Sequence, residues 1–133
     1  MPKLIDQFEA RYLLGVSSMD ETHREFVDLV NRLGEADKQQ FISLFDELLR
    51  HTQAHFDAEN LLMDESGFPA AREHKDEHQR VLGDIHRFAT RVAVGAVPLA
   101  RAYLNQQLPD WFNLHAITMD SALAAHLKQT HRQ

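Results

Sequence analysis

The chain of 133 residues has no cysteine, one tryptophan, two tyrosines and no long apolar run. Without cysteine, disulfides, thiolate-bound metals, iron–sulfur clusters and cysteine nucleophiles are all excluded. Any bound metal must therefore be held by His, Asp or Glu. No stretch approaches the roughly 18 apolar residues of a membrane span, and charged residues interrupt the N-terminal stretch where a signal peptide would be apolar. We expect a cytoplasmic protein that does not contact membranes.

Basic residues are also scarce, since 14 Lys and Arg face 20 Asp and Glu and give a formal charge of −6. Phosphate recognition needs clustered Lys and Arg, so nucleic acid is not an expected partner. The composition, 44% hydrophobic and 26% charged, is typical of one soluble globular domain. We assign residues 1–133 to a single domain, with an N-terminal arm over 1–17 and a helical bundle over about 18–128.

Turn-forming residues divide the chain into helical stretches, and strand signals are absent. Ser18 and Glu21 have the spacing of a capping box, which predicts a first helix that begins near Met19 and ends at Gly34. A second helix follows, with the clearest apolar stripe in the chain, and Gly67 is expected to end it.

A third helix is predicted over about 70–92, with Pro69 suited to its first turn. In the fourth helix Pro109 removes a backbone donor, so this helix should bend or restart near Asp110. A short last helix is expected over 121–128. Amphipathic helices joined by short connections predict an all-α fold, an up-down-up-down four-helix bundle with an N-terminal arm and a short C-terminal helix.

Nine histidines stand out against the missing cysteines, and several lie on the apolar stripes together with a glutamate. The polar stripe positions are His23, His55, Glu59, His74, His78 and His115. One histidine on such a stripe is usually an ordinary core residue, but five on four helices, partly at i,i+4 spacing, are hard to explain independently. A buried unpaired carboxylate is costly, and a cation would compensate it and use the imidazole lone pairs. Facing stripes converge in a bundle, so the sequence predicts a metal site in the core.

Asp120 lies five residues after His115, which at about 100° per residue places it off the same helical face. We expect the helix to end or turn between them, so that Asp120 can point back at the metal. Five imidazoles and two carboxylates are too many for one tetrahedral zinc and too poor in oxygen for calcium or magnesium. They suit two bridged transition-metal ions, with iron favoured and manganese, cobalt and zinc left open.

The remaining histidines are interpreted as ordinary edge or tail residues. They are His51, His86, His126 and His131. For His51, which precedes His55 by one helical turn, a supporting role behind that ligand stays open.

The spacing of these residues resembles the bacterial hemerythrins over about residues 15–127. The matching runs are Met19-Asp20-Glu21-Thr22-His23, His55-Phe56-Asp57-Ala58-Glu59, His74-x-x-x-His78 and Trp111-x-x-x-His115-x-x-x-x-Asp120. The resemblance implies two irons bridged by two carboxylates and a solvent-derived oxo or hydroxo group. In that assignment one iron is held by His74, His78 and His115, the other by His23 and His55, and Glu59 and Asp120 bridge them.

The resemblance further implies reversible dioxygen binding at the open position of the two-His iron, for oxygen storage, delivery or sensing, and no enzymatic activity. Phe56, Trp111 and Phe112 are predicted to supply a dry apolar pocket. Ala116 stands where family members commonly have Ile, which should widen access for water and anions. Asn60 replaces a second Glu after the bridging one, and we expect little consequence.

Two other classes stay open. A diiron enzyme acting on peroxide or nitric oxide, or oxidising and storing iron, would need a proton donor, and no carboxylate beyond the ligands is evident on an inner stripe. A sensory module is usually fused to an output domain, whereas this chain ends within a few residues of its last helix. A free-standing sensor would need an unidentified signalling partner protein.

Overall fold

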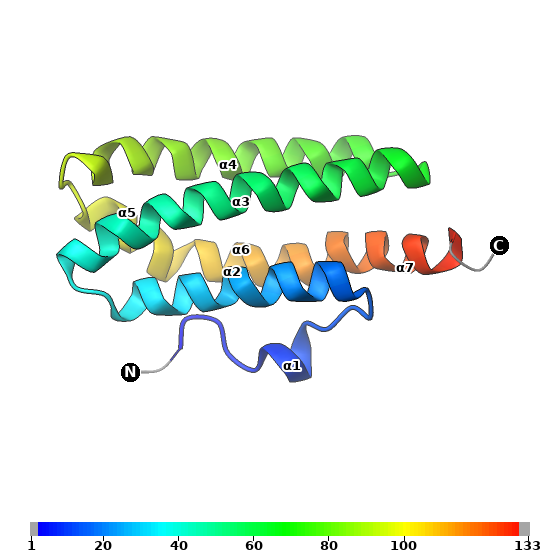
Figure 1. Cartoon of the computed structure of the whole chain (residues 1–133), viewed down its shortest axis with the longest axis horizontal. Coiled ribbons are helices and arrows are strands. Elements are labelled where there is room, and N and C mark those ends of the chain that lie inside the picture. Colours follow the sequence, from blue (N-terminus) through cyan, green and yellow to red (C-terminus); the bar gives the residue numbers. More distant parts are fainter. Residues whose placement is uncertain (1–2, 131–133) are drawn as a thin grey trace.

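The computed structural model describes residues 3–130 as a bundle of antiparallel helices (Figure 1). The elements are α1 (Phe8–Arg11), α2 (Ser17–Glu35), α3 (Lys38–Ser66), α4 (Ala71–Ala93), α5 (Pro98–Gln106), α6 (Leu108–His115), the π-helix η1 (Ala116–Asp120) and α7 (Ser121–Thr130). Residues 3–130 contain no strand, so the predicted all-α bundle is confirmed. In Figure 1, α2, α3 and α4 run in alternating directions, and α5 to α7 together form the fourth rod.

The bundle has two apolar clusters. The larger one includes Phe26, Phe56 and Phe112, and the smaller one, which includes Met19 and Met63, lies toward α7. His23 lies between Met19 of the smaller cluster and Phe26 of the larger one, and Glu59 lies between Phe56 of the larger cluster and Met63 of the smaller one. The fold therefore places a polar layer inside an otherwise apolar core.

The helix starts differ from expectation in one place. The predicted capping box of Ser18 and Glu21 is wrong, because α2 begins before it, with Val16 at the N-cap and no side chain capping the helix. A capping box does form at the start of α3. There the Asp37 side chain accepts from the Gln40 backbone N–H at 2.9 Å, and the Gln40 side chain accepts from the Asp37 N–H at 3.1 Å.

Gly34 does not end the first long helix, since α2 continues through Glu35 and stops where Ala36 turns extended. Its role is close packing against the N-terminal arm. A Cβ at Gly34 would lie 2.8 Å from the Leu4 side chain, a distance that real Cβ atoms do not show. Gly34 therefore allows the arm to pack closely against α2 and does not mark the end of the helix.

Of two other turn residues, Gly67 acts as predicted and Pro69 does not. Gly67 ends α3 in the left-handed conformation, with φ 65°, as a C-terminal glycine is expected to do. Pro69 is outside the first turn of α4, which was predicted to hold it, because a turn between Phe68 and Ala71 comes first. The helix that follows agrees with the predicted range to within one residue at each end.

The predicted interruption at Pro109 is confirmed, since the fourth rod breaks at Gln107 and restarts as α6 with Pro109 in its first turn. That position needs no backbone donor. The last helix is not a separate short element, because α6, η1 and α7 follow one another without a gap.

The N-terminal arm lies along α2 (Figure 1) and includes the short helix α1, which the sequence did not indicate. The Ile5 backbone and the Asn31 side chain exchange two hydrogen bonds of 2.9 Å. Farther along, the Tyr12 hydroxyl donates to Asn113 Oδ1 at 2.7 Å, which ties the arm to α6. Among the described helices, none combines the length and the apolar character that crossing a bilayer requires.

Candidate metal centre

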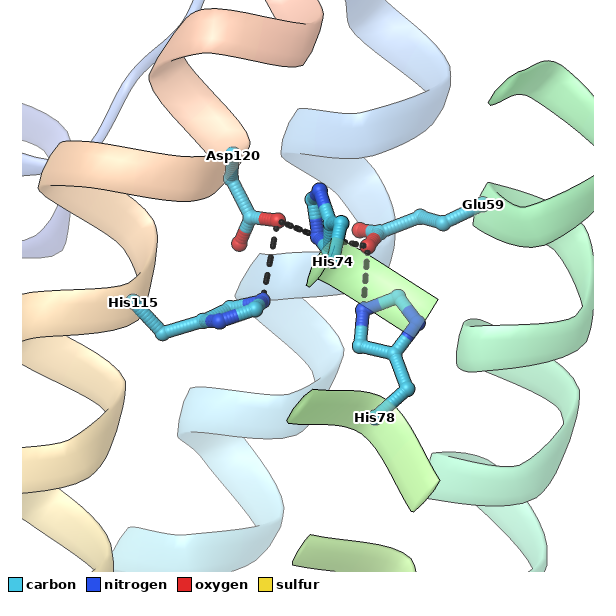
Figure 2. A group of neighbouring side chains, drawn as sticks. All are labelled: Glu59, His74, His78, His115 and Asp120. Carbon is cyan, nitrogen blue, oxygen red and sulfur yellow. Dashed lines mark ion pairs between the residues drawn. The ribbon is translucent and has the colours of Figure 1, made fainter. Parts of the chain in front are cut away.

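The polar layer of the bundle is a cluster of seven buried His, Glu and Asp side chains. It divides into two groups that share one glutamate. One group contains Glu59, His74, His78, His115 and Asp120, and the other contains His23, His55 and Glu59. The structure thus brings together all seven residues that the sequence singled out. All four rods contribute, and Figure 2 shows the larger group converging from α3, α4, α6 and η1.

Asp120 reaches the cluster through a π-helical turn, which the sequence did not predict. The helix does not end after His115 but continues as a π-helix over Ala116–Asp120. Because π-helical hydrogen bonds run from i to i+5, the wider turn returns a residue five positions on to the same face. Asp120 Oδ1 consequently lies 3.2 Å from His115 Nε2.

The Glu59 carboxylate lies between the two histidine groups. Its Oε1 is 3.1 Å from His78 Nε2 and 3.6 Å from His74 Nε2. Its Oε2 is 3.0 Å from His23 Nε2 and 2.7 Å from His55 Nε2. One oxygen thus faces the three-His group and the other faces the two-His group.

Asp120 repeats this arrangement from the opposite rod. Its Oδ1 lies 3.1 Å from His74 Nε2 and 3.2 Å from His115 Nε2, as Figure 2 shows, and its Oδ2 lies 3.3 Å from His23 Nε2. Two carboxylates that each direct one oxygen to either side have the geometry of bridging ligands.

The donor atoms fit a pair of cations. Several are buried without a hydrogen-bond partner in the described part of the chain. They are the Nε2 atoms of His74, His78 and His115, Oε1 of Glu59 and Oδ1 of Asp120. Unpartnered polar atoms in a core are costly, and coordination of a metal would use these lone pairs.

Both carboxylates are held in the charged form. Burial, the largest effect, raises the pKa of Glu59, but the charge of His55 and hydrogen bonds from His23 and His55 outweigh it and hold the pKa well below its usual range. For Asp120, burial and the nearby Glu59 charge raise the pKa, but the adjacent His115 and His74 imidazoles lower it overall. The site therefore presents two anionic bridging groups to a cation.

The pKa values of two histidines that face these carboxylates, His74 and His78, shift in opposite directions. Burial lowers the pKa of His74, but the adjacent Asp120 and Glu59 carboxylates raise it overall to about 9. For His78 burial prevails, and the pKa is lowered. Metal coordination needs the imidazole lone pair, so metal competes with protons at His74.

Asn60 contacts one of the candidate ligands, His78. His78 Nδ1 lies 2.9 Å from Asn60 Oδ1, and a carbonyl oxygen can only accept, so Nδ1 carries the proton. The lone pair is then on Nε2, which faces Glu59. The expectation of little consequence at this position did not include this contact, through which the amide can orient a candidate ligand.

The aromatic residues predicted to line the oxygen pocket lie in different places. The Phe56 ring stacks on the His78 ring with 3.9 Å between the ring centroids, and its centroid lies 5.1 Å from that of His55. The Trp111 ring stacks on the His115 ring on the three-His side, with 4.7 Å between the ring centroids. Its indole N–H donates a hydrogen bond to the Glu77 carboxylate at 2.7 Å.

Phe112 meets His23 edge-on at 5.9 Å, so it lies on the two-His side. The Phe26 ring stacks on that of Phe112 with 5.4 Å between the ring centroids, and its centroid lies 6.3 Å from that of His55. Its position three residues after His23 on the same stripe was the available signal. Ala116 is fully buried and lies among the core residues of the larger cluster.

One further carboxylate, that of Asp20, is buried near the cluster. Asp20, three residues before His23 on the same stripe, is 9% exposed, so the view that inner stripes carry no carboxylate beyond the ligands is wrong. Its oxygens accept from the backbone N–H groups of Leu14 and Gly15 at 2.7 and 3.1 Å. Asp20 therefore anchors the arm.

Three of the other histidines, His51, His86 and His126, lie outside the cluster. His51 Nε2 is 3.1 Å from Glu25, and its ring is 6.1 Å from that of His55 without a hydrogen bond between them. His126 bonds the Ser66 carbonyl at 2.8 Å, and His86 is exposed. His131 lies outside the described residues.

Taken together, the fold and the cluster define a helical-bundle protein with a buried site for two metal ions, held by histidines and bridging carboxylates. Residues 14–131 match the family model described as the hemerythrin HHE cation binding domain, and the chain belongs to this family. Members are non-haem diiron proteins that typically bind oxygen and are generally not enzymes.

Similar proteins agree with this assignment. The chain is 34% identical over 116 residues to a bacteriohemerythrin of Ralstonia nicotianae, covering 87% of this chain and 84% of that protein. It is 27% identical over 128 residues to a bacteriohemerythrin of Stenotrophomonas maltophilia, covering 90% and 82%. Among solved structures, wild-type hemerythrin superposes with a TM-score of 0.84 at 21% identity, covering 93% of this chain and 98% of that one.

Proposed function

We propose that this chain binds dioxygen reversibly at a pair of irons, for oxygen storage, delivery or sensing. The observation that carries the proposal is the asymmetry of the cluster. Three imidazoles lie on one side of the bridging carboxylates and two lie on the other. The two-His side therefore offers one protein ligand fewer, which leaves a position for an exogenous ligand. In a sensing role, a separate signalling protein would read the oxygenated state.

The surroundings of the two-His group support reversibility. When bound, a pair of ferrous ions supplies the electrons that the dioxygen ligand accepts and returns. Phe26 and Phe112 are 1% and 2% exposed and pack on His55 and His23, so they exclude water from the face of this group that they cover. Water exclusion limits the protonation that would release a reduced oxygen species irreversibly.

The alternative is a diiron enzyme acting on peroxide or nitric oxide, or an iron oxidase. One observation favours it. The His51 ring lies 6.1 Å from the His55 ring, centroid to centroid, and bonds Glu25, which is 58% exposed, so a second imidazole lies between a candidate ligand and the surface. A proton donor in that place is what such an enzyme requires.

One experiment separates the two functions. The iron-loaded protein is reduced without oxygen, oxygen is added, and the visible spectrum is recorded before and after deoxygenation. A charge-transfer band that forms and disappears supports oxygen carriage. Irreversible oxidation without such a band contradicts it and favours the enzyme.

The ligand assignment has its own test. His78→Ala and Glu59→Ala each remove donors that face the metal positions, so iron content should fall to one or none per chain. His86→Ala is the matched control, because His86 lies on the same helix but is exposed. Iron per folded chain, measured by atomic absorption, checks the prediction, and full retention in the first two variants would refute the assignment.

A further inference from the structure

A cavity of about 250 Å³ between α2 and α3 has two candidate ligands in its wall. Met19 and Thr22 line it from α2, and Ala58 and Leu62 line it from α3, together with His55 and Glu59. Both candidate ligands belong to the two-His group, on the side with fewer protein ligands.

The lining of this cavity is mostly apolar. Met19 is buried, Leu62 is half-buried, and Leu61 at the exposed part of the wall is 58% exposed. The Thr22 hydroxyl donates to the Ser18 carbonyl of its own helix at 2.9 Å, so its donor is already engaged. Such a wall disfavours a hydrated ion, which would have to lose water, but it does not oppose a small neutral molecule.

The other face of the two-His group is covered by aromatic rings. One helical turn beyond His23, the rings of Phe26 and Phe112 pack together and the Tyr12 ring of the arm covers Phe112 at 5.1 Å. These rings are 1%, 2% and 4% exposed. The cavity instead lies on the Met19 side, one turn before His23.

Building on the proposed function, we propose that this cavity is the route by which small neutral molecules, dioxygen among them, reach the two-His position, and that Ala58 sets its width. Ala58 lies between His55 and Glu59 in sequence, is exposed, and has the smallest side chain in the wall. A large side chain at this surface position would close the cavity without altering the packed core.

The first measurement does not depend on iron chemistry. In zinc-loaded, diamagnetic protein, dissolved oxygen should enhance the NMR relaxation of the Met19 and Leu62 methyl protons above that of Val81, a buried core reference. Ala58→Trp should abolish the difference. Ala54→Trp, one turn earlier on α3 and also exposed, is outside the wall and should preserve it.

The second measurement uses reduced, iron-loaded protein in a stopped-flow instrument. Ala58→Trp should slow the reaction with oxygen by about tenfold, equivalent to about 1.4 kcal/mol in the barrier, while Ala54→Trp leaves the rate unchanged. Equal relaxation of the Met19, Leu62 and Val81 methyls in the unmodified protein would overturn the proposal even if Ala58→Trp did not fold. A normal relaxation pattern with no reversible oxygen band would instead refute the proposed function and leave the cavity assignment standing.

Discussion

At the scale of single residues, the side chains behind the ligands matter as much as the ligands themselves. Asn60 illustrates this, because its amide oxygen accepts from His78 Nδ1 and directs the ring's other nitrogen toward Glu59. Outer partners of this kind fix the tautomer and orientation of a ligating imidazole.

Asn60→Leu should weaken metal binding by about 10- to 100-fold, because the His78 N–H loses its acceptor and the ring its fixed orientation. Asn60→Asp keeps an acceptor at the same place and serves as the control. Competition with a chelator measures the affinity. Equal affinities for the original chain and Asn60→Leu would show that the contact does not orient the ligand.

Ala116 is a second residue with a testable role. It lines a cavity of about 150 Å³ beneath the arm, together with Tyr12, Leu14 and Ile117. Ala116→Ile should fill part of this space, restrict water and anions, and slow autoxidation of the oxygenated protein severalfold. The decay of the visible band measures the rate, and an unchanged rate would contradict the role assigned to Ala116.

At the scale of secondary-structure elements, the π-helix η1 decides whether the fourth rod completes the site. In an α-helix the residue four positions after His115 would share its face, but here the residue five positions on does so. Such π-turns are rare and occur often at functional sites.

Exchanging the two last residues of η1, Met119→Asp with Asp120→Met, should abolish iron binding, because the π-turn points position 119 away from the cluster. Iron content and circular dichroism are measured together, so that loss of metal is separated from loss of fold. Retention of two irons by this variant would mean that the turn readily reverts to α-helix and does not define the site.

At the scale of the whole molecule, the metal and the fold stabilise each other. The cluster draws on four rods, so metal bound there holds the rods together. Removal of metal by a chelator should lower Tm, because a ligand at a hundredfold excess over its Kd contributes about 2.7 kcal/mol, or roughly 10 °C for a chain of this size. Differential scanning calorimetry checks this, and identical Tm values with and without metal would contradict it.

The sequence by itself determined the helical class, most of the helices and the seven candidate ligands. These depend on local patterns, such as the i,i+4 spacing of His74 and His78 or the glycine that ends α3, and a local pattern can be found without knowing which helices meet. The same logic failed at Ser18, where an apparent capping box lies inside a helix whose start is organised by Asp20 and the arm.

Only the tertiary structure decided how the pieces meet. It turned the two oxygens of each bridging carboxylate, Glu59 and Asp120, to opposite histidine groups. It also brought Asn60 into contact with His78 and left a cavity between α2 and α3. Each feature depends on side chains far apart in sequence and on packing distances of a few ångströms. Periodicity shows which face of a helix is buried, but the neighbour that it meets there is fixed only when the helices pack.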